Sequence, residues 1–177
     1  MPRLFAGLEL PETVVRQAWL ARGGVIGARW LEPKDYHITL RFIGDVDASL
    51  AREIVEALGE IRRPSALVGF AGLGWFGGDR PRAIVLKVRA DPALMELQAE
   101  QERRLRRVGV SPETRKFTPH LTLARLRRVG AAAVADYLAS RGALKVEDFR
   151  ATRFVLYSAR EGTGGGPYLV EAAYPLG

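Results

Sequence analysis

The spacing of apolar and polar residues divides the chain into alternating strands and helices. Runs that alternate between apolar and polar positions, or that are rich in β-branched residues, predict strands, whereas apolar residues three or four positions apart predict helices. The expected strands cover residues 3–10, 36–43, 67–76, 83–88, 120–126, 146–158 and 168–175. Helices are expected to begin at Pro11, after the cap residues Asp47 and Asp91, and at Ala131. This mixture predicts an α+β fold with antiparallel strands.

A glycine-rich segment at the end of one expected strand needs its own interpretation. Residues 72–77 read Gly-Leu-Gly-Trp-Phe-Gly and satisfy the glycine spacing of dinucleotide-binding proteins. That motif functions where a strand leads into a helix, and here a turn with Gly78 and Pro81 leads into another strand. We therefore predict a β-hairpin. A second glycine run, residues 162–166, lacks the lysine and hydroxyl residue of a P-loop and predicts a connecting loop.

One short motif occurs twice in the chain. His37-Ile-Thr-Leu and His120-Leu-Thr-Leu lie 83 residues apart, and in both cases a helix is expected about eleven residues after the histidine. Two similar lobes would make the two histidines counterparts of each other. A chain of 177 residues has the size of one domain, so we expect residues 1–177 to form a single domain with two lobes.

The repeated motif places an imidazole and a hydroxyl group on one face of each strand. Because side chains alternate along a strand, His37 and Thr39 point to one side, and His120 and Thr122 do the same in the second motif. Arg41 continues this face two residues beyond Thr39, which makes it a candidate for binding phosphate. A solvated arginine at a strand end is the alternative for Arg41.

The sequence contains two histidines, and both belong to this motif. A single histidine on a half-buried strand is most often a structural residue, but two in the same frame favour a catalytic pair. With an ordinary pKa of about 6.5, one imidazole can act as a base and the other as an acid. An in-line displacement at phosphorus needs this pair, with hydroxyl and guanidinium groups on the phosphoryl oxygens and no metal. Two histidines without cysteine are too few for a usual zinc site.

The composition is compatible with an anionic partner. The formal net charge is +7, and 23 of the 27 basic residues are arginine, whose planar guanidinium suits phosphate. Genome composition or a hot habitat would explain the same preference for arginine, so the charge is supporting evidence only. The sequence has no cysteine, which excludes disulfides, thiolate metal sites and a cysteine nucleophile.

No segment predicts an export signal or a membrane span. The apolar stretch at the N-terminus is interrupted by Glu9 and Pro11. The longest apolar run, residues 66–78, is broken by glycine and is shorter than the roughly 20 residues that a spanning helix needs. We expect a cytoplasmic monomer that uses no cofactor.

Two longer segments around the histidines resemble the signature segments of the 2H phosphoesterases. They cover residues 37–45 and 115–125, and further similarity includes Trp30, residues 70–77 and short stretches near both ends. Within this superfamily the sequence is most similar to the bacterial and archaeal RNA 2′,3′-cyclic phosphodiesterases, historically called 2′-5′ RNA ligases.

The resemblance implies a pseudo-symmetric, two-lobed fold in which two antiparallel sheets line a central cleft with helices outside. It also implies that the protein opens RNA 2′,3′-cyclic phosphate ends to 2′-phosphomonoesters, with His37 as proton donor to the 3′ oxygen and His120 as the base for water. Thr39 and Thr122 match phosphate-contacting hydroxyls, and Arg125 matches a basic position after the second motif. Without the resemblance, either histidine could be the acid.

Two other functions are compatible with the sequence. The same site run in reverse would join a cyclic phosphate to a 5′-hydroxyl end as a 2′-5′ linkage, although water at about 55 M favours hydrolysis. A non-catalytic RNA-binding module would use the arginine surface and would need neither histidine. Candidate substrates include tRNA fragments, RNA decay products and small cyclic nucleotides. Four aromatic residues are candidates for stacking on bases: Trp30, Tyr36, Phe42 and Trp75.

Overall fold

The computed structural model describes residues 1–159 and 168–177, and the elements below belong to these residues. In chain order they are β1 (Arg3–Leu8), α1 (Glu12–Trp19), β2 (Ala28–Trp30), the 3-10 turn η1 (Pro33–Asp35), β3 (Ile38–Asp45), α2 (Ala48–Gly59), β4 (Ala66–Val68), β5 (Phe70–Phe76), β6 (Ala83–Val88), α3 (Pro92–Arg107), β7 (His120–Leu126), α4 (Ala131–Ser140), β8 (Phe149–Ala151), β9 (Arg153–Ala159) and β10 (Leu169–Pro175).

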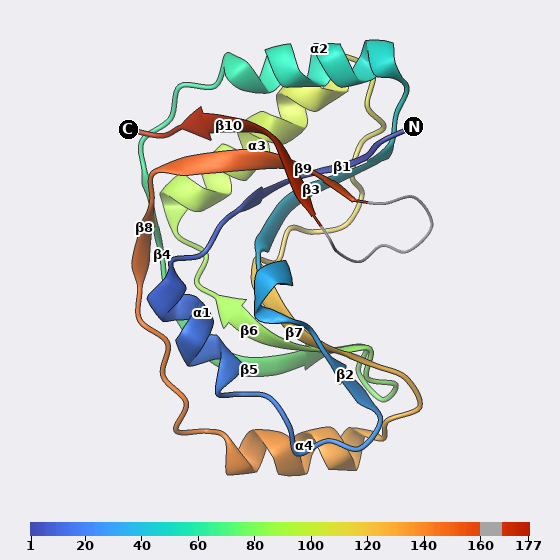
Figure 1. The fold of residues 1–177 in the computed structure, drawn as a ribbon, viewed down its shortest axis with the longest axis vertical. Helices are drawn as coiled ribbons and strands as arrows, with labels where there is room; N and C mark the ends of the chain where they lie inside the picture. Colours follow the sequence, from blue (N-terminus) through green and yellow to red (C-terminus); the bar gives the residue numbers. More distant parts are fainter. Residues whose placement is uncertain (160–167) are drawn as a thin grey trace.

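Two groups of antiparallel strands meet at the centre of the molecule. The order β10-β9-β1-β3 forms one group and the order β7-β6-β5 forms the other, while β2 pairs with β7 and β4 with β8. The two groups are joined where Ile38 of β3 pairs with Leu121 of β7. Beyond this bridge β3 and β7 run apart (Figure 1). The joined sheet therefore has two halves, which confirms the predicted two-lobed α+β architecture.

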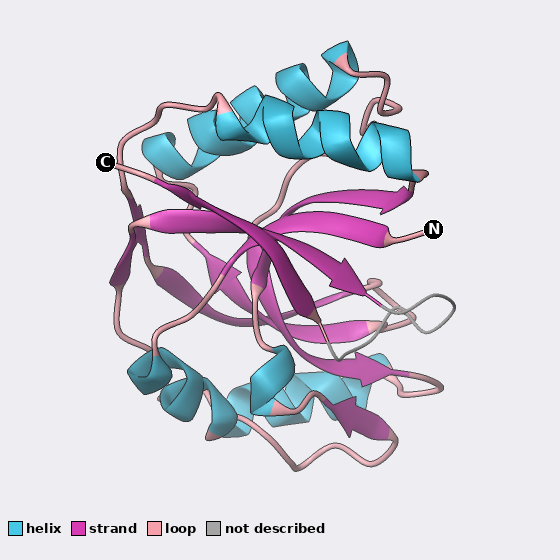
Figure 2. Cartoon of the chain, turned by 45° about the horizontal axis from the view of Figure 1, so that its top comes forward, coloured by secondary structure: helices cyan, strands magenta, loops and turns pink. Residues whose placement is uncertain are grey.

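The helices cover the outer sides of the two halves. α2 and α3 pack against each other and against β10, β3 and β4, and they form one end of the molecule (Figures 1 and 2). α1 and α4 lie at the opposite end, where α4 contacts β5. We call these the α2/α3 lobe and the α1/α4 lobe. Each lobe takes one helix from the first half of the sequence and one from the second.

Local sequence accounts for the starts of the two longest helices. The side chain of Asp47 accepts a hydrogen bond from the backbone amide of Leu50 at 2.8 Å. Asp91 accepts from the backbone amides of Ala93 and Leu94 at 3.1 and 3.3 Å, and Pro92 is the first residue of α3. These are the N-cap positions predicted from the sequence.

Most expected elements are present with small shifts at their ends, and the exceptions are short. β2 and η1 have three residues each, too few to give a periodic signal, and they were not predicted. The expected strand 146–158 is two strands, and so is 67–76. The dinucleotide-like glycines lie in β5 and in its turn to β6, so the β-hairpin is confirmed. The expected loop at residues 162–166 lies outside the described residues.

Candidate active site

His37 lies immediately before β3, and both of its ring nitrogens have partners. Nδ1 donates a hydrogen bond to the carbonyl oxygen of Asp35 at 2.9 Å, and Nε2 lies 2.9 Å from the hydroxyl oxygen of Thr39. Because a carbonyl oxygen can only accept, Nδ1 carries the proton in the neutral ring. Nε2 then accepts from the Thr39 hydroxyl, and it is the nitrogen that is available for proton transfer.

Three aromatic rings surround the His37 imidazole. The distances between ring centroids are 4.9 Å to Phe5, 5.0 Å to Tyr168 and 5.7 Å to Tyr157. This burial lowers the pKa of His37, against the opposing effect of the hydrogen bond to Asp35. The three rings come from distant parts of the sequence, so residue patterns alone did not reveal that they enclose His37.

His120, the first residue of β7, repeats the arrangement of His37. Its Nδ1 donates to the carbonyl oxygen of Thr118 at 2.7 Å, and the ring of Phe76 lies edge-on at 4.6 Å between centroids. In both motifs the acceptor is the carbonyl of the second residue before the histidine. Burial lowers the pKa of His120, and the positive charge of Arg125 acts in the same direction on both histidines. The Arg125 guanidinium is therefore within electrostatic reach of both rings.

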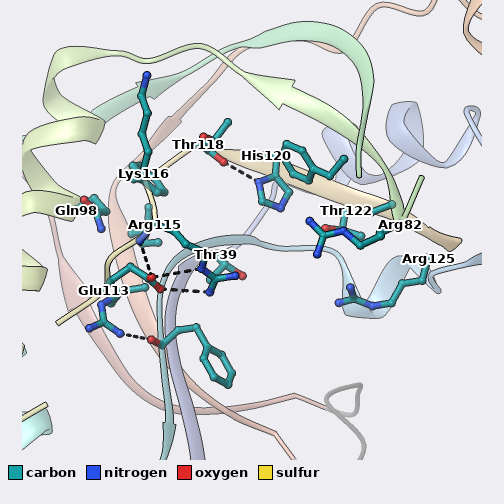
Figure 3. A pocket seen from close by; sticks show the side chains of 16 residues that line it. Thr39, Arg82, Gln98, Glu113, Arg115, Lys116, Thr118, His120, Thr122 and Arg125 are labelled. Carbon is teal, nitrogen blue, oxygen red and sulfur yellow. Dashed lines mark hydrogen bonds and ion pairs between the residues drawn. The ribbon is translucent and has the colours of Figure 1, made fainter. Parts of the chain in front are cut away.

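Two adjoining cavities meet between the histidine motifs. The larger, of about 410 Å³, borders His120, and the smaller, of about 270 Å³, borders His37. Five residues line both cavities: Thr39, Phe42, His120, Thr122 and Arg125. Figure 3 shows how the labelled side chains gather around the larger cavity. The structure thus brings together the predicted residues His37, His120, Thr39, Thr122 and Arg125.

Both motif strands contain a β-bulge one residue after the threonine. In β3, Thr39 and Arg41 pair with consecutive residues of β1, so Leu40 is the extra residue. In β7, Thr122 and Ala124 pair with consecutive residues of β6, so Leu123 is the extra residue. A bulge interrupts the alternation of side chains. As a result, the fifth residue after each histidine, Phe42 or Arg125, is exposed at the cavities.

The bulge also corrects the expectation for Arg41. Strict alternation would have placed Arg41 on the same face as Thr39, but its side chain is only 5% exposed. Its Nε binds the carboxylate of Glu102, its Nη1 the carbonyl of Phe42 and its Nη2 the carbonyl of Ser111 at 2.6 Å. Arg41 borders the larger cavity, yet its guanidinium joins β3 to α3. It is neither solvated nor open to a ligand in this arrangement.

The four aromatic candidates have different surroundings. Phe42 is 48% exposed and lines both cavities. Tyr36 is buried, Trp30 packs on Tyr137, and the indole of Trp75 donates to the carbonyl of Gly78 outside the cavities. Of these four, Phe42 alone can meet a ligand beside the histidines.

Two further properties concern the described residues only. No helix within 1–159 or 168–177 is long and apolar enough to cross a membrane. Within the same ranges, no three histidine, aspartate or glutamate side chains are grouped so that they could hold a metal ion.

The fold and the paired motifs define a class of two-lobed α+β proteins in which one histidine motif comes from each half of the chain. The chain belongs to the family of LigT-like phosphoesterases: the family model matches residues 9–85 and again residues 86–168. Each match contains one of the two histidine motifs. This double match agrees with the internal repeat that the sequence indicated.

Several related proteins are named RNA 2′,3′-cyclic phosphodiesterase. The one from Aeropyrum pernix is 42% identical over 99 residues, which are 55% of this chain and 56% of the relative. The Thermotoga maritima protein is 34% identical over 134 residues, covering 71% and 70% of the two chains. The Archaeoglobus fulgidus protein is 29% identical over 87% and 92%. For the Geobacillus stearothermophilus relative, the match spans only 32% of that protein.

Solved structures share the fold across the whole chain. Escherichia coli LigT complexed with 3′-AMP superposes with a TM-score of 0.78 at 24% identity, covering 99% of both chains. A Thermus thermophilus protein also gives 0.78, at 21% identity and 98% and 97% coverage. At these identities the superpositions establish the fold.

Proposed function

We propose that the protein hydrolyses the 2′,3′-cyclic phosphate at the 3′ end of RNA to a 2′-phosphomonoester. A water oxygen attacks phosphorus while His120 accepts the water proton, and the bond from phosphorus to O3′ breaks as His37 donates a proton to O3′. The observation that carries the proposal is the pair of imidazoles, each with its Nδ1 bound to a backbone carbonyl, on either side of one shared cavity region. The names of the relatives support the same reaction.

The hydrogen bonds at Nδ1 support the acid and base roles. Each bond fixes the tautomer and the ring orientation, and leaves Nε2 as the group that exchanges a proton. The enclosed ring of His37 suits the leaving-group side, because aromatic side chains exclude water there. His120 borders both cavities, which leaves space beside it for the attacking water.

Binding of the phosphate is assigned to Thr39, Thr122 and Arg125. All three line both cavities between the histidines, and no described residue forms an ion pair with Arg125. A guanidinium group can donate two parallel hydrogen bonds to phosphate oxygens and stabilise the charge that develops in the transition state. Phe42 supplies an exposed aromatic ring against which the terminal base can stack.

The negative charge of the substrate would favour protonation of His37. In the unliganded protein, burial and the Arg125 charge lower the pKa of His37, which disfavours the protonated form that an acid requires. A phosphate anion bound beside the ring has the opposite effect and would raise this pKa. Substrate binding would therefore favour the protonated form of His37, which its role as the acid requires.

A single chain can carry out this reaction. Both histidine motifs lie on strands of one sheet, and residues from both lobes form one continuous apolar core. We therefore propose that residues 1–177 act as one two-lobed domain and as a monomer.

The test uses an oligoribonucleotide that ends in a 2′,3′-cyclic phosphate, incubated with the protein in excess EDTA. The expected product resists a phosphatase specific for 3′-phosphates, because its phosphate is on O2′. A cyclic end that stays unchanged would overturn the proposal. A parallel reaction with an added 5′-hydroxyl RNA measures 2′-5′ joining, the alternative outcome.

A further inference from the structure

The larger cavity holds more positive charge than one reacting phosphate requires. Five basic residues line it: Arg41, Arg82, Arg115, Lys116 and Arg125. Arg41 is bound to Glu102, and Arg115 is paired with Glu113 at 3.3 Å. The other three, Arg82, Lys116 and Arg125, have no acidic partner among residues 1–159 and 168–177. With Arg125 assigned to the reacting phosphate, the remaining charges are unexplained.

Arg82 directly precedes β6, one residue before the position that is opposite Arg125 of β7. Ala83 of β6 is in register with Arg125 of β7, and the backbone amide of Leu126 donates to the carbonyl of Arg82 at 2.8 Å. Neighbouring strands are about 4.8 Å apart, so the two arginines start from adjacent points of the sheet. Figure 3 shows both guanidinium groups on the same side of His120. Two adjacent unpaired cations repel each other, and a second anion would relieve that repulsion.

The other neighbour of Arg125 gives a useful contrast. Arg29 of β2 is directly opposite Arg125 on the edge of β7 away from β6, and it is exposed, as Arg82 is. Arg29 does not line either cavity, whereas Arg82 lines the larger one. Arg29 and Arg82 therefore lie on opposite sides of β7 from each other and carry the same charge, and of the two it is Arg82 that lines the larger cavity.

We propose that Arg82 binds the phosphodiester on the 5′ side of the terminal ribose, so that the enzyme prefers a cyclic end attached to a chain over a cyclic mononucleotide. This inference rests on the proposed function. RNA carries one phosphate charge per nucleotide, and the cyclic phosphate closes the 3′ end, so the next anion lies on the 5′ side. An arginine beside the reacting phosphate is placed to bind that anion.

The test compares three substrates. The first is cytidine 2′,3′-cyclic phosphate, the second is a dinucleotide with the same cyclic end, and the third is that dinucleotide with an uncharged methylphosphonate linkage. The dinucleotide should have a kcat/KM roughly tenfold above that of the mononucleotide, the effect of about one charge-assisted contact. The methylphosphonate should return to the level of the mononucleotide.

Variants then assign the contact. Arg82→Ala should remove most of the roughly tenfold preference for the charged linkage, whereas Arg29→Ala, the matched control, should keep it. Equal kcat/KM for the charged and uncharged linkages would overturn the inference alone. So would an Arg82→Ala variant that loses activity equally on all three substrates, since Arg82 would then act on the reacting phosphate. Failure to hydrolyse any of the three would overturn the proposed function and the inference with it.

Discussion

Ile38 and Leu121 pair across β3 and β7, and each residue directly follows a histidine. Because the two residues hold the same place in the two motifs, an approximate twofold axis passes between them and exchanges His37 with His120. The register of this antiparallel pair can be continued by one residue in each direction. It then places His37 toward Thr122, and His120 toward Thr39. The bridge that joins the lobes is thus also the centre of the candidate active site.

Replacement of either histidine tests the acid and base roles. We expect His37→Ala and His120→Ala each to lower kcat by about 10²–10⁴-fold, because each removes one of the two proton-transfer groups. Turnover of a 2′,3′-cyclic mononucleotide measures this, and thermal unfolding checks that both variants are folded. Most of the activity surviving in either variant would contradict the two-histidine mechanism.

The pH dependence follows from the direction of the two pKa shifts. Both histidine pKa values are lowered from 6.5 in the free protein. The proposed mechanism needs His37 protonated and His120 neutral. The profile of kcat/KM, which reports the free enzyme, should therefore peak below pH 6.5 and fall as His37 loses its proton at higher pH. The peak of kcat should lie at higher pH, because bound phosphate raises both pKa values.

NMR titration of the two imidazoles provides the direct measurement. Both should titrate below pH 6.5 in the free protein and move upward when inorganic phosphate is added. A ring that titrates above 6.5 without a ligand would contradict the burial argument for that histidine.

Substitution of Arg41 should mainly lower stability, whereas substitution of Arg125 should mainly lower activity. Arg41→Ala leaves Glu102 without its guanidinium partner in a largely buried place, and should lower the free energy of unfolding by about 3 kcal/mol. Arg125 is exposed, so Arg125→Ala should change stability little and lower kcat/KM by about 10²-fold. Chemical denaturation and steady-state kinetics on both variants measure the contrast. A stable but inactive Arg41→Ala variant would restore Arg41 as a phosphate ligand.

Gly7 of β1 should be essential for the position of the first motif. A Cβ atom at this residue would lie 2.8 Å from the carbonyl oxygen of Ile38 and 3.2 Å from the Tyr157 ring. Gly7→Ala should therefore displace the backbone beside His37, with a loss of about 1–3 kcal/mol in stability and a fall in kcat. Gly142→Ala is the control, because its added Cβ would lie 3.8 Å from its nearest neighbour, an ordinary contact. Equal stability of the two variants would contradict the prediction.

The sequence predicted what depends on local patterns. The start of β7 at His120 and the N-caps at Asp47 and Asp91 were expected, since a cap or an alternating strand is determined by a few adjacent residues. The pairing of the two motifs came from an internal repeat, which a single sequence can also reveal.

Features that depend on tertiary contacts were missed or misjudged. The bulge at Leu40 has no local signal, so alternation placed Arg41 on the wrong face. The ion pair between Arg41 of β3 and Glu102 of α3 joins residues 61 positions apart, and no local pattern indicates it. The aromatic enclosure of His37 requires Phe5 and Tyr157 to meet, which only the order of the strands determines.

The exchange of helices between the halves of the chain has a mechanical consequence. α1 follows β1 but belongs to the α1/α4 lobe, and α3 follows β6 but belongs to the α2/α3 lobe. The backbone therefore crosses between the lobes several times. Parting the lobes would require every one of these connections to bend together, whereas a hinge needs only a few such segments. We expect this topology to keep the distance between the two histidines nearly constant, so that in the proposed reaction the acid and the base are already in place before the RNA end binds.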